Sequence, residues 1–477
     1  MKKIYLFMLF VASFSVSCKK DFGDINVDKK KPSEVPPGAL FSFATKSLTD
    51  DLNSSNVNSN IFRMLAQQWT ETTYIDEANY DLATRDIPQN FWNNIYLNTI
   101  KSLNETQRLI PLQGALVGKD VQTNQDACAE ILNVYAFSVL VNTFGNIPYT
   151  QALDPENVYP KYDDAATIYT DLLKRLDAAI AKIKATEAGF GDNDLLYGGD
   201  MAGWKTFGYS LKLKMGMLLA DSNPATAKSV VEAAAPKALM SNVDNVAFHY
   251  LTAPPNTNPV WVDLVQSGRK DFVGANTLVD AMIALHDPRI PQYFTEDAKG
   301  LYSGGIYAAS NNYSTYSKPS HTVTAPDFEA LFIDASEVQF LLAEAVERGM
   351  SVGGTAASHY EAAIRASIEY WGGTSAEADA YLAQPTVAYA TAKGNYKQKI
   401  GTQKWIALYN RGFDAWTEWR RFDFPVLTPP AGMTQNDIPK RFTYPVQEQN
   451  LNTANFNAAA TAIGGDKVTT KLFWDKF

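Results

Sequence analysis

Residues 335 to 371 read ASEVQFLLAEAVERGMSVGGTAASHYEAAIRASIEYW. In the first part, from 335 to 348, apolar and small side chains recur every three or four residues, which is the spacing of one face of an α-helix. The part from 356 to 371 shows the same period after a short turn. Small residues such as Ala343, Ala345 and Ala363 stand where two packed helices would approach closely. The stretch therefore predicts a helix, a turn and a second helix.

The same period recurs along the chain, so this pair is one of several. It marks the segments 86–108, 122–144, 164–186, 201–221, 396–410 and 412–423. The pair at 335–371 resembles a tetratricopeptide unit, and four such pairs can be counted at irregular spacing. We predict an all-α-dominated fold: an irregular α-solenoid of four tetratricopeptide-like helix pairs with a loop-rich ligand-binding portion. Tryptophans at helical spacing are expected in its core: Trp92, Trp204, Trp371, Trp405 and Trp416.

Two long stretches lack helical periodicity. Residues 240–330 are irregular apart from 275–285 and are rich in Gly, Pro, Asn, Ser and Tyr, while 424–467 contains closely spaced prolines and asparagines. Long irregular segments in a compact protein are usually functional or disordered. The aromatic content of the first stretch is unlike that of a disordered linker. We expect both to be loop-rich insertions in a single body that spans residues 39–477.

The N-terminus has the pattern of an export signal. Lys2 and Lys3 precede an apolar run from 4 to 14, and small residues lead to Cys18. The run is shorter than the roughly 20 residues that cross a bilayer about 30 Å thick, so residues 1–17 are predicted to be a cleaved signal peptide. Cys18 resembles the acceptor cysteine of a bacterial lipoprotein, although Ser15 stands where leucine is usual, and ordinary secretion is the alternative. Polar residues 18–38 are expected to form a lipidated tether.

Composition argues against several function classes. The net charge of −9 disfavours nucleic acid, whose affinity for proteins comes largely from Lys and Arg. Cys128 is the other cysteine, and its small apolar neighbours predict core packing. The four histidines show no zinc-binding spacing, and no nucleophile or phosphate-loop motif is present. We expect no metal, no cofactor and no enzymatic activity; a calcium ion in the loops and a hydrolase with an unrecognised carboxylate pair are the alternatives.

A set of motifs in a fixed order resembles the SusD/RagB-type outer-membrane lipoproteins. No single motif is specific, but their order together with the N-terminal cysteine is. The matching stretches are Asn26-Val27-Asp28, FGNIPY at 144–149 followed by Ala152, RKDF at 269–272, DPR at 287–289, EVQFLLAEA at 337–345, QKW at 403–405, RGFDAW at 411–416, Arg420-Arg421, and Arg441-Phe442-x-Tyr444-Pro445 with Glu448.

The resemblance implies both a location and a partner. Such a protein is anchored by its lipid to the outer membrane, faces the cell exterior and caps a SusC-type TonB-dependent transporter. It captures oligosaccharides, or possibly peptides, and delivers them to that transporter. A structural lid that binds no ligand by itself is the alternative. The membrane would be contacted through the N-terminal lipid only.

Sugar binding makes specific demands on side chains. The apolar faces of a sugar ring stack on aromatic rings, while its hydroxyls need amide, carboxylate or guanidinium partners. The candidates that meet these demands outside the helical pattern are Trp69, Tyr74, Tyr80, Asn258, Trp261, Arg269, Tyr302, Tyr307 and Tyr313. Two have structural alternatives: Trp69 ends a predicted helix and could belong to the core, and Arg269 could pair with Asp271 or Asp263 in its own loop.

Overall fold

A computed structural model describes residues 35–477. The predicted signal peptide, Cys18 and most of the predicted tether lie outside the described residues. The chain divides into two units, Met1–Pro36 and Pro37–Phe477. The second unit opens on helix α2 (Pro37–Asn53), so helix begins two residues before the predicted start of the body at residue 39.

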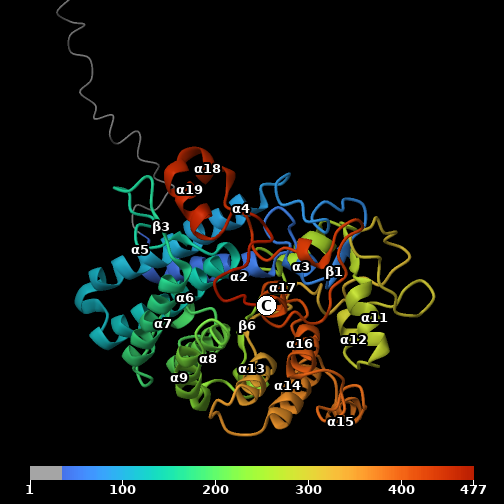
Figure 1. The fold of residues 1–477 in the computed structure, drawn as a ribbon. Helices are drawn as coiled ribbons and strands as arrows, with labels where there is room; N and C mark the ends of the chain where they lie inside the picture. Colours follow the sequence, from blue (N-terminus) through green and yellow to red (C-terminus); the bar gives the residue numbers. More distant parts are fainter. Residues whose placement is uncertain (1–34) are drawn as a thin grey trace, which may run out of the picture. The chain divides into compact units, whose positions relative to one another are not determined.

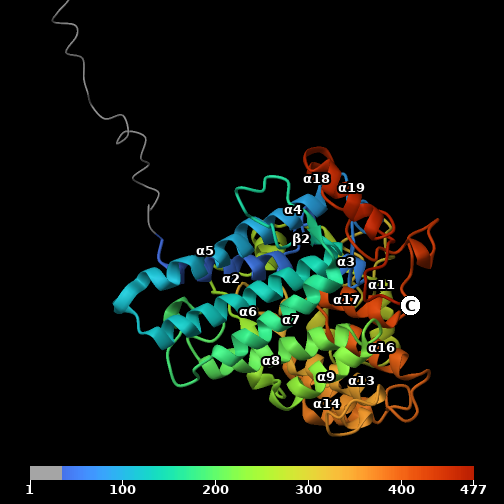
Figure 2. The ribbon, with the colours of Figure 1, turned by 60° about the vertical axis from the view of Figure 1, so that its left-hand side comes forward.

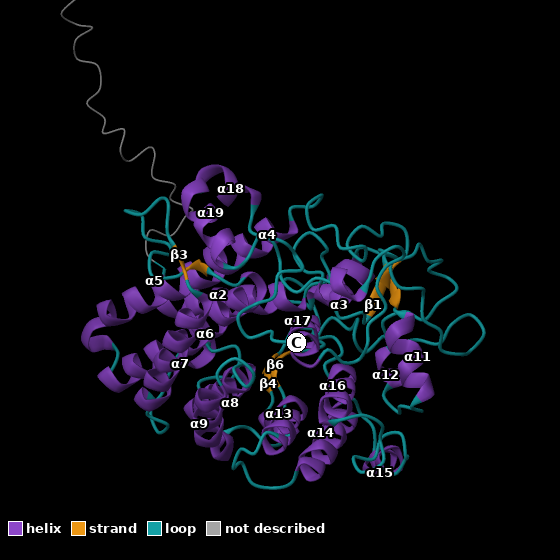
Figure 3. Cartoon of the chain, in the orientation of Figure 1, coloured by secondary structure: helices purple, strands orange, loops and turns teal. Residues whose placement is uncertain are grey.

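The second unit is mostly helical, as the sequence predicts (Figure 3). The four expected pairs are present, and the two helices of each pair pack against each other. Along the chain they are α5 (Lys101–Leu109) with α6 (Lys119–Phe144), α7 (Ala165–Lys182) with α8 (Met201–Leu218), α13 (Ala335–Glu347) with α14 (Ala356–Tyr370), and α16 (Tyr396–Ala407) with α17 (Gly412–Phe422). Figures 1 and 2 show helices α6 to α9 followed by the α13–α14 and α16–α17 pairs.

Side-chain caps fix where the helices of the 335–371 stretch begin. The Asp334 carboxylate accepts the N–H of Glu337 at 2.7 Å, and Thr355 forms a capping box with Ser358. These caps satisfy N–H groups that a helix start otherwise leaves without partners. The local sequence thus specifies both starts.

Several helices are not anticipated by the sequence, and one predicted helix is divided. The unanticipated helices are α9 (Pro224–Ala234), α15 (Ser375–Leu382), α18 (Val446–Leu451) and α19 (Thr453–Ala462). The last two lie within 424–467, so the prediction of an irregular stretch there is wrong for its second half. The 86–108 segment is α4 (Ile87–Asn93), a π-helix η1 (Asn94–Ile100) and α5 in succession.

The 240–330 stretch is loop-rich, as expected, and contains short elements only. These are η5 (Asn242–Asp244), β4 (Val246–Phe248), α10 (Pro259–Trp261), the π-helix η6 (Val262–Gln266), β5 (Phe272–Gly274), α11 (Asn276–Ala284) and α12 (Ile290–Tyr293). The remaining short elements are α3 (Phe62–Leu65), β1 (Trp69–Glu71), η2 (Ile110–Leu116), β2 (Ile147–Pro148), β3 (Tyr162–Asp163), η3 (Gly191–Asn193), η4 (Ala235–Lys237), β6 (Ala330–Ile333) and η7 (Gln435–Asp437). The strands pair antiparallel as β1–β5, β2–β3 and β4–β6.

The core confirms the predicted packing roles. The five tryptophans at helical spacing are all buried, and so is Cys128 in α6. Helix α6 is long and apolar enough to cross a membrane, but 94% of its most apolar window is buried inside the protein, as in a core helix. The guanidinium of Arg420 lies 3.5 Å from the ring centre of Trp416 in α17, which gives that arginine a structural role.

Candidate functional site

An open cavity of about 490 Å³ lies where two loops leave the β1–β5 ribbon. It brings together two of the predicted ligand-binding residues, Tyr74 and Arg269, which are far apart in the sequence. Its walls also carry charged groups. The full lining is Val57, Asn58, Glu71, Thr72, Thr73, Tyr74, Glu77, Arg85, Arg269, Asp271 and Phe272.

The short antiparallel ribbon explains why these loops meet. Glu71, the last residue of β1, lies opposite Phe272, the first residue of β5. Beyond the ribbon, Thr72 donates its N–H to the Asp271 carbonyl at 2.9 Å and its hydroxyl to the Lys270 carbonyl at 2.7 Å. The loop that follows β1 and the loop that precedes β5 therefore leave the ribbon side by side.

Tyr74 and Arg269 present the chemistry expected of a sugar site. Tyr74 is 68% exposed, so its ring is free to cover an apolar ligand face. The Arg269 side chain is 63% exposed, and its nearest carboxylate oxygen, from Asp271, is 3.6 Å away. The predicted pairing of Arg269 with Asp271 is thus present but loose, and guanidinium N–H groups remain available to ligand hydroxyls.

The cavity lining also holds charged groups that the sequence analysis missed. The Arg85 guanidinium pairs with the Glu77 carboxylate, and Glu71 lies beside them, 2% exposed. Burial, a hydrogen bond with Glu77 and the negative charges of Glu77 and Asp76 raise the pKa of Glu71 to about 9. Glu71 is therefore neutral near pH 7. The sequence feature that could have indicated these groups is the oppositely charged pair Glu77 and Arg85, which stands in a segment without helical periodicity.

Four of the predicted ligand-binding residues are buried, so the structure does not present their side chains to a ligand. Trp69 is 1% exposed, its indole donates to the Tyr409 hydroxyl at 2.9 Å, and it belongs to the core. Tyr307 donates to the Met64 carbonyl at 3.0 Å, and Tyr80 is buried nearby. Asn258 is fully buried and caps α10 by accepting the Val260 N–H at 2.8 Å.

The remaining candidates lie outside the cavity lining. Tyr313 is half-buried between Lys270 and Lys318, whose ammonium nitrogens are 6.0 and 5.3 Å from its ring centre. Since Lys270 follows Arg269, this ring neighbours the cavity loop. Trp261, the last residue of α10, and Tyr302, on another loop, are half-buried. Their role in ligand binding stays a prediction.

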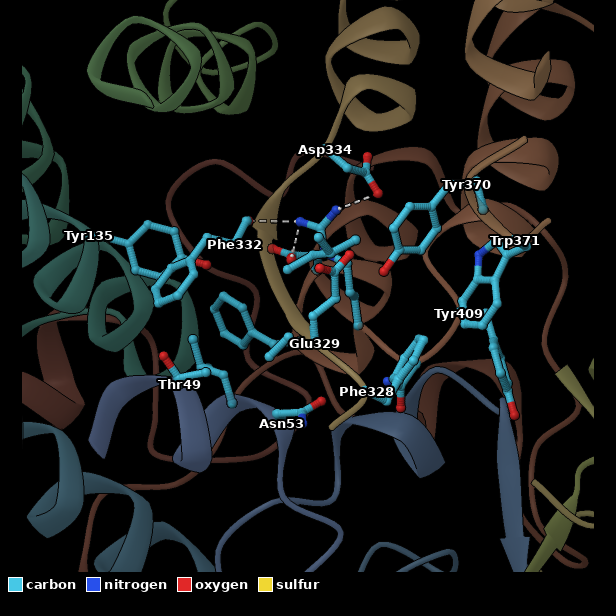
Figure 4. Close-up of a pocket in the computed structure, with 18 residues that line it drawn as sticks. Thr49, Asn53, Tyr135, Phe328, Glu329, Phe332, Asp334, Tyr370, Trp371 and Tyr409 are labelled. Atoms are coloured by element: carbon cyan, nitrogen blue, oxygen red, sulfur yellow. Dashed lines mark hydrogen bonds and ion pairs between the residues drawn. The ribbon is translucent and has the colours of Figure 1, made fainter. Parts of the chain in front are cut away.

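A second cavity, drawn in Figure 4, is too small to hold a sugar. It encloses about 40 Å³, room for a few water molecules. Asp334, Tyr135 and Tyr370 line it, and the Arg411 guanidinium binds Asp334 and Asp414 within the lining. These ion pairs connect neighbouring helices, so the charged groups in this cavity have a structural role.

Among residues 35–477, no group of three or more His, Cys, Asp or Glu side chains that could hold a metal ion occurs. The Glu71 and Glu77 carboxyls are in hydrogen-bonding contact. Glycosidases separate their two carboxyls by about 5 to 9.5 Å to admit a sugar or a water, so this pair does not match that geometry.

Comparison with known proteins shows the family to which this chain belongs. A SusD-like family model, described as starch-binding associating with outer membrane, matches residues 29–445. The chain belongs to this family. Among functionally curated proteins, no significant sequence relative was found.

Solved SusD-like structures share the fold over nearly the whole chain. A chitin-binding protein is 25% identical with a TM-score of 0.80, and the match covers 92% of this chain and 100% of that one. A SusD homolog from Bacteroides uniformis is 24% identical with a TM-score of 0.79, covering 93% and 100% of the two chains. A chitin-binding SusD homolog from Flavobacterium johnsoniae is 24% identical with a TM-score of 0.76, covering 92% and 97%.

Proposed function

We propose that this SusD-like protein binds nutrient oligosaccharides in the cavity between the β1 and β5 loops. The observation that carries the proposal is the convergence of the exposed Tyr74 ring with the Arg269 guanidinium in an open cavity of about 490 Å³. A cavity of this size admits a few sugar units, within the usual range of ligand pockets of about 300 to 1,000 Å³. The chitin-binding relatives favour a glycan over a peptide.

The charge of the cavity favours neutral sugars. Arg85 is compensated by Glu77, Arg269 faces Asp271, and Glu71 is neutral near pH 7. An uncharged glycan would meet hydrogen-bond donors and acceptors here without an uncompensated charge. Neutral oligosaccharides of N-acetylglucosamine or glucose are therefore the first ligands to test.

We further propose that the protein is lipidated at Cys18, faces the cell exterior and delivers its ligand to a SusC-type TonB-dependent transporter. Family membership and the N-terminal signal support this proposal. Affinity purification from detergent-solubilised outer membranes should recover a barrel partner. Recovery of the protein alone, under conditions that keep other outer-membrane complexes intact, would contradict the partnership.

Replacing Tyr74 by alanine should weaken oligosaccharide binding about 5- to 30-fold, because the stacked ring contributes about 1 to 2 kcal/mol. Isothermal titration with chito- and malto-oligosaccharides measures the change, and the melting temperature should stay unchanged because the ring is 68% exposed. Tyr159→Ala is the matched control: Tyr159 is 63% exposed and does not line the cavity. Equal effects of the two variants would refute this location.

The structural-lid alternative gives a different titration result. A protein that contributes to ligand contact only within a transporter complex would bind no oligosaccharide by itself at millimolar concentration. It would nevertheless be recovered with its barrel partner. The titration and the affinity purification together separate the two proposals.

A further inference from the structure

Two buried carboxyl groups meet in the wall of the cavity. Glu71 is 2% exposed and Glu77 is fully buried. One Glu71 oxygen accepts the N–H of Ala78 at 3.0 Å, which holds the neighbouring Glu77 against it. One Glu77 oxygen pairs with Arg85, and the other has no hydrogen-bond donor among the described residues when every carboxyl is counted as ionised. A proton on Glu71 supplies that missing donor.

This pair lies at the base of the loop that builds one side of the cavity. The loop, residues 72–86, carries both Tyr74 and Arg85. Its first residue, Thr72, accepts the N–H of Asn311 at 2.9 Å, and Asn79 donates its side-chain amide to the Ala308 carbonyl at 2.9 Å. Between these anchors, the loop is hydrogen-bonded to β1 through the Glu71 carboxyl, which accepts the Ala78 N–H. Two carboxylates without the proton would repel each other at this point.

We propose that Glu71 and Glu77 are positioning residues whose one shared proton keeps the 72–86 loop closed, so that ligand binding in the cavity weakens as pH rises. The inference rests on the proposed function, because it takes the cavity as the ligand site. It assigns no contact between either carboxyl and the ligand.

The charged groups around the pair determine its titration. Asp76 on the loop adds negative charge near Glu71, and Arg85 compensates Glu77. Across the cavity, the charges of Arg269 and Asp271 offset each other. The buried Tyr307 hydroxyl near Glu71 is neutral, because burial is the main cause that raises its pKa. Burial and the neighbouring carboxylates together raise the pKa of Glu71 to about 9.

The direction of the pH effect follows from linkage. With the loop closed, Glu71 keeps its proton up to about pH 9; with the loop open, it titrates near its ordinary value of 4.5. Between these values the closed state holds a proton that the open state has lost, so each rise of one pH unit shifts the balance about tenfold towards opening. Affinity stays constant while the closed state predominates, then falls by up to about tenfold per pH unit. Above about pH 9 the fall stops.

Glu71→Gln is the decisive variant. Its amide can donate to Glu77 and accept from Ala78 at any pH, so it mimics the protonated carboxyl. Triacetylchitotriose, a neutral trisaccharide, is titrated calorimetrically into the mature protein at pH 6, 7, 8 and 9. We expect the wild-type affinity to fall across this range and the Glu71→Gln affinity to stay within about twofold of its pH 6 value. Glu361→Gln, at an exposed position of α14, should follow the wild type.

A fall in affinity of the same size in Glu71→Gln, or a wild-type protein whose affinity and loop exchange both follow Glu71→Gln at every pH, would overturn the inference. Hydrogen exchange of the 72–86 amides without sugar supplies an independent measurement. At a given pH the intrinsic exchange rates of these amides are the same in the two proteins, so any difference between them reports loop opening. The wild type should therefore exchange increasingly faster than Glu71→Gln as pH rises. If no sugar binds to either protein, the proposed function fails, and exchange alone then decides the inference. Equal exchange at every pH would refute it.

Discussion

Replacing Arg411 by methionine should lower the free energy of unfolding by about 3 to 5 kcal/mol, because the change leaves buried carboxylates without their partner. The Arg411 guanidinium binds Glu337 at 2.5 Å, Asp414 at 2.6 Å and Asp334 at 3.3 Å. Lys214 reaches Glu337 at 2.9 Å and Asp414 at 2.5 Å, but one ammonium cannot compensate both. Methionine keeps much of the side-chain volume, so the lower free energy of unfolding reflects the missing charge and not a missing volume. Urea unfolding at pH 7 measures it.

The pH dependence of that loss identifies its origin. Burial alone would raise the pKa of Glu337, but Arg411 and Lys214 hold it at about 2. Because this value lies below the ordinary 4.5, the stabilisation is present above about pH 4.5 and disappears as the pH falls towards 2. The difference between wild type and Arg411→Met should therefore shrink between pH 5 and pH 3. A constant difference would indicate a packing effect.

Arg365→Met is the matched control. Arg365 pairs with Asp379 on the surface, at 2.6 Å, with side-chain exposures of 36% and 69%. Exposed pairs contribute about 0 to 1 kcal/mol, so this variant should unfold close to the wild type. A decrease in the free energy of unfolding as large as that of Arg411→Met would show that burial of the ion-pair network is not the cause of the effect.

Replacing Cys18 by alanine should release the protein from the membrane. A buried acyl chain contributes about 0.8 kcal/mol per methylene, and two or more chains anchor a protein firmly. Without the acceptor thiol no chain is attached, and we infer no other membrane contact. Fractionation of cells should move the protein from the outer membrane to the soluble fraction, while exogenous protease should digest the wild type on intact cells.

The second cysteine gives the control. Cys128 is 1% exposed inside α6, and Cys128→Ala should leave the protein in the membrane fraction. A Cys18→Ala protein that stayed in the membrane after a carbonate wash would show that lipid is not the anchor. Protection of the wild type from protease on intact cells would contradict its proposed outward orientation.

The helical pairs were predictable because their signal is local. Apolar side chains at the spacing of 335–371 define a face to be buried, and caps such as Asp334 fix the starts. The π-helix η1 escaped prediction, since the apolar period alone does not distinguish it from the α-helices on either side. Helices α18 and α19 escaped for a related reason: together they bury little apolar surface.

The cavity was predictable only in part, because it depends on a long-range strand pairing. Tyr74 and Arg269 carry the expected chemistry, but their meeting requires β1 to pair with β5 some 200 residues away. The same pairing sets Trp69 opposite Gly274, and its ring is buried. Loss of helical periodicity is shared by an exposed loop and a buried strand, so the sequence did not separate Tyr74 from Trp69.

A crystal structure of the mature protein with a chito- or malto-oligosaccharide bound tests the central proposal most directly. We predict a sugar ring stacked on Tyr74, with hydroxyl or acetamido oxygens within hydrogen-bonding distance of Arg269 or Arg85. A sugar bound elsewhere, for example in the apolar groove beside Trp92 and Leu97, with the β1–β5 cavity empty, would contradict the account.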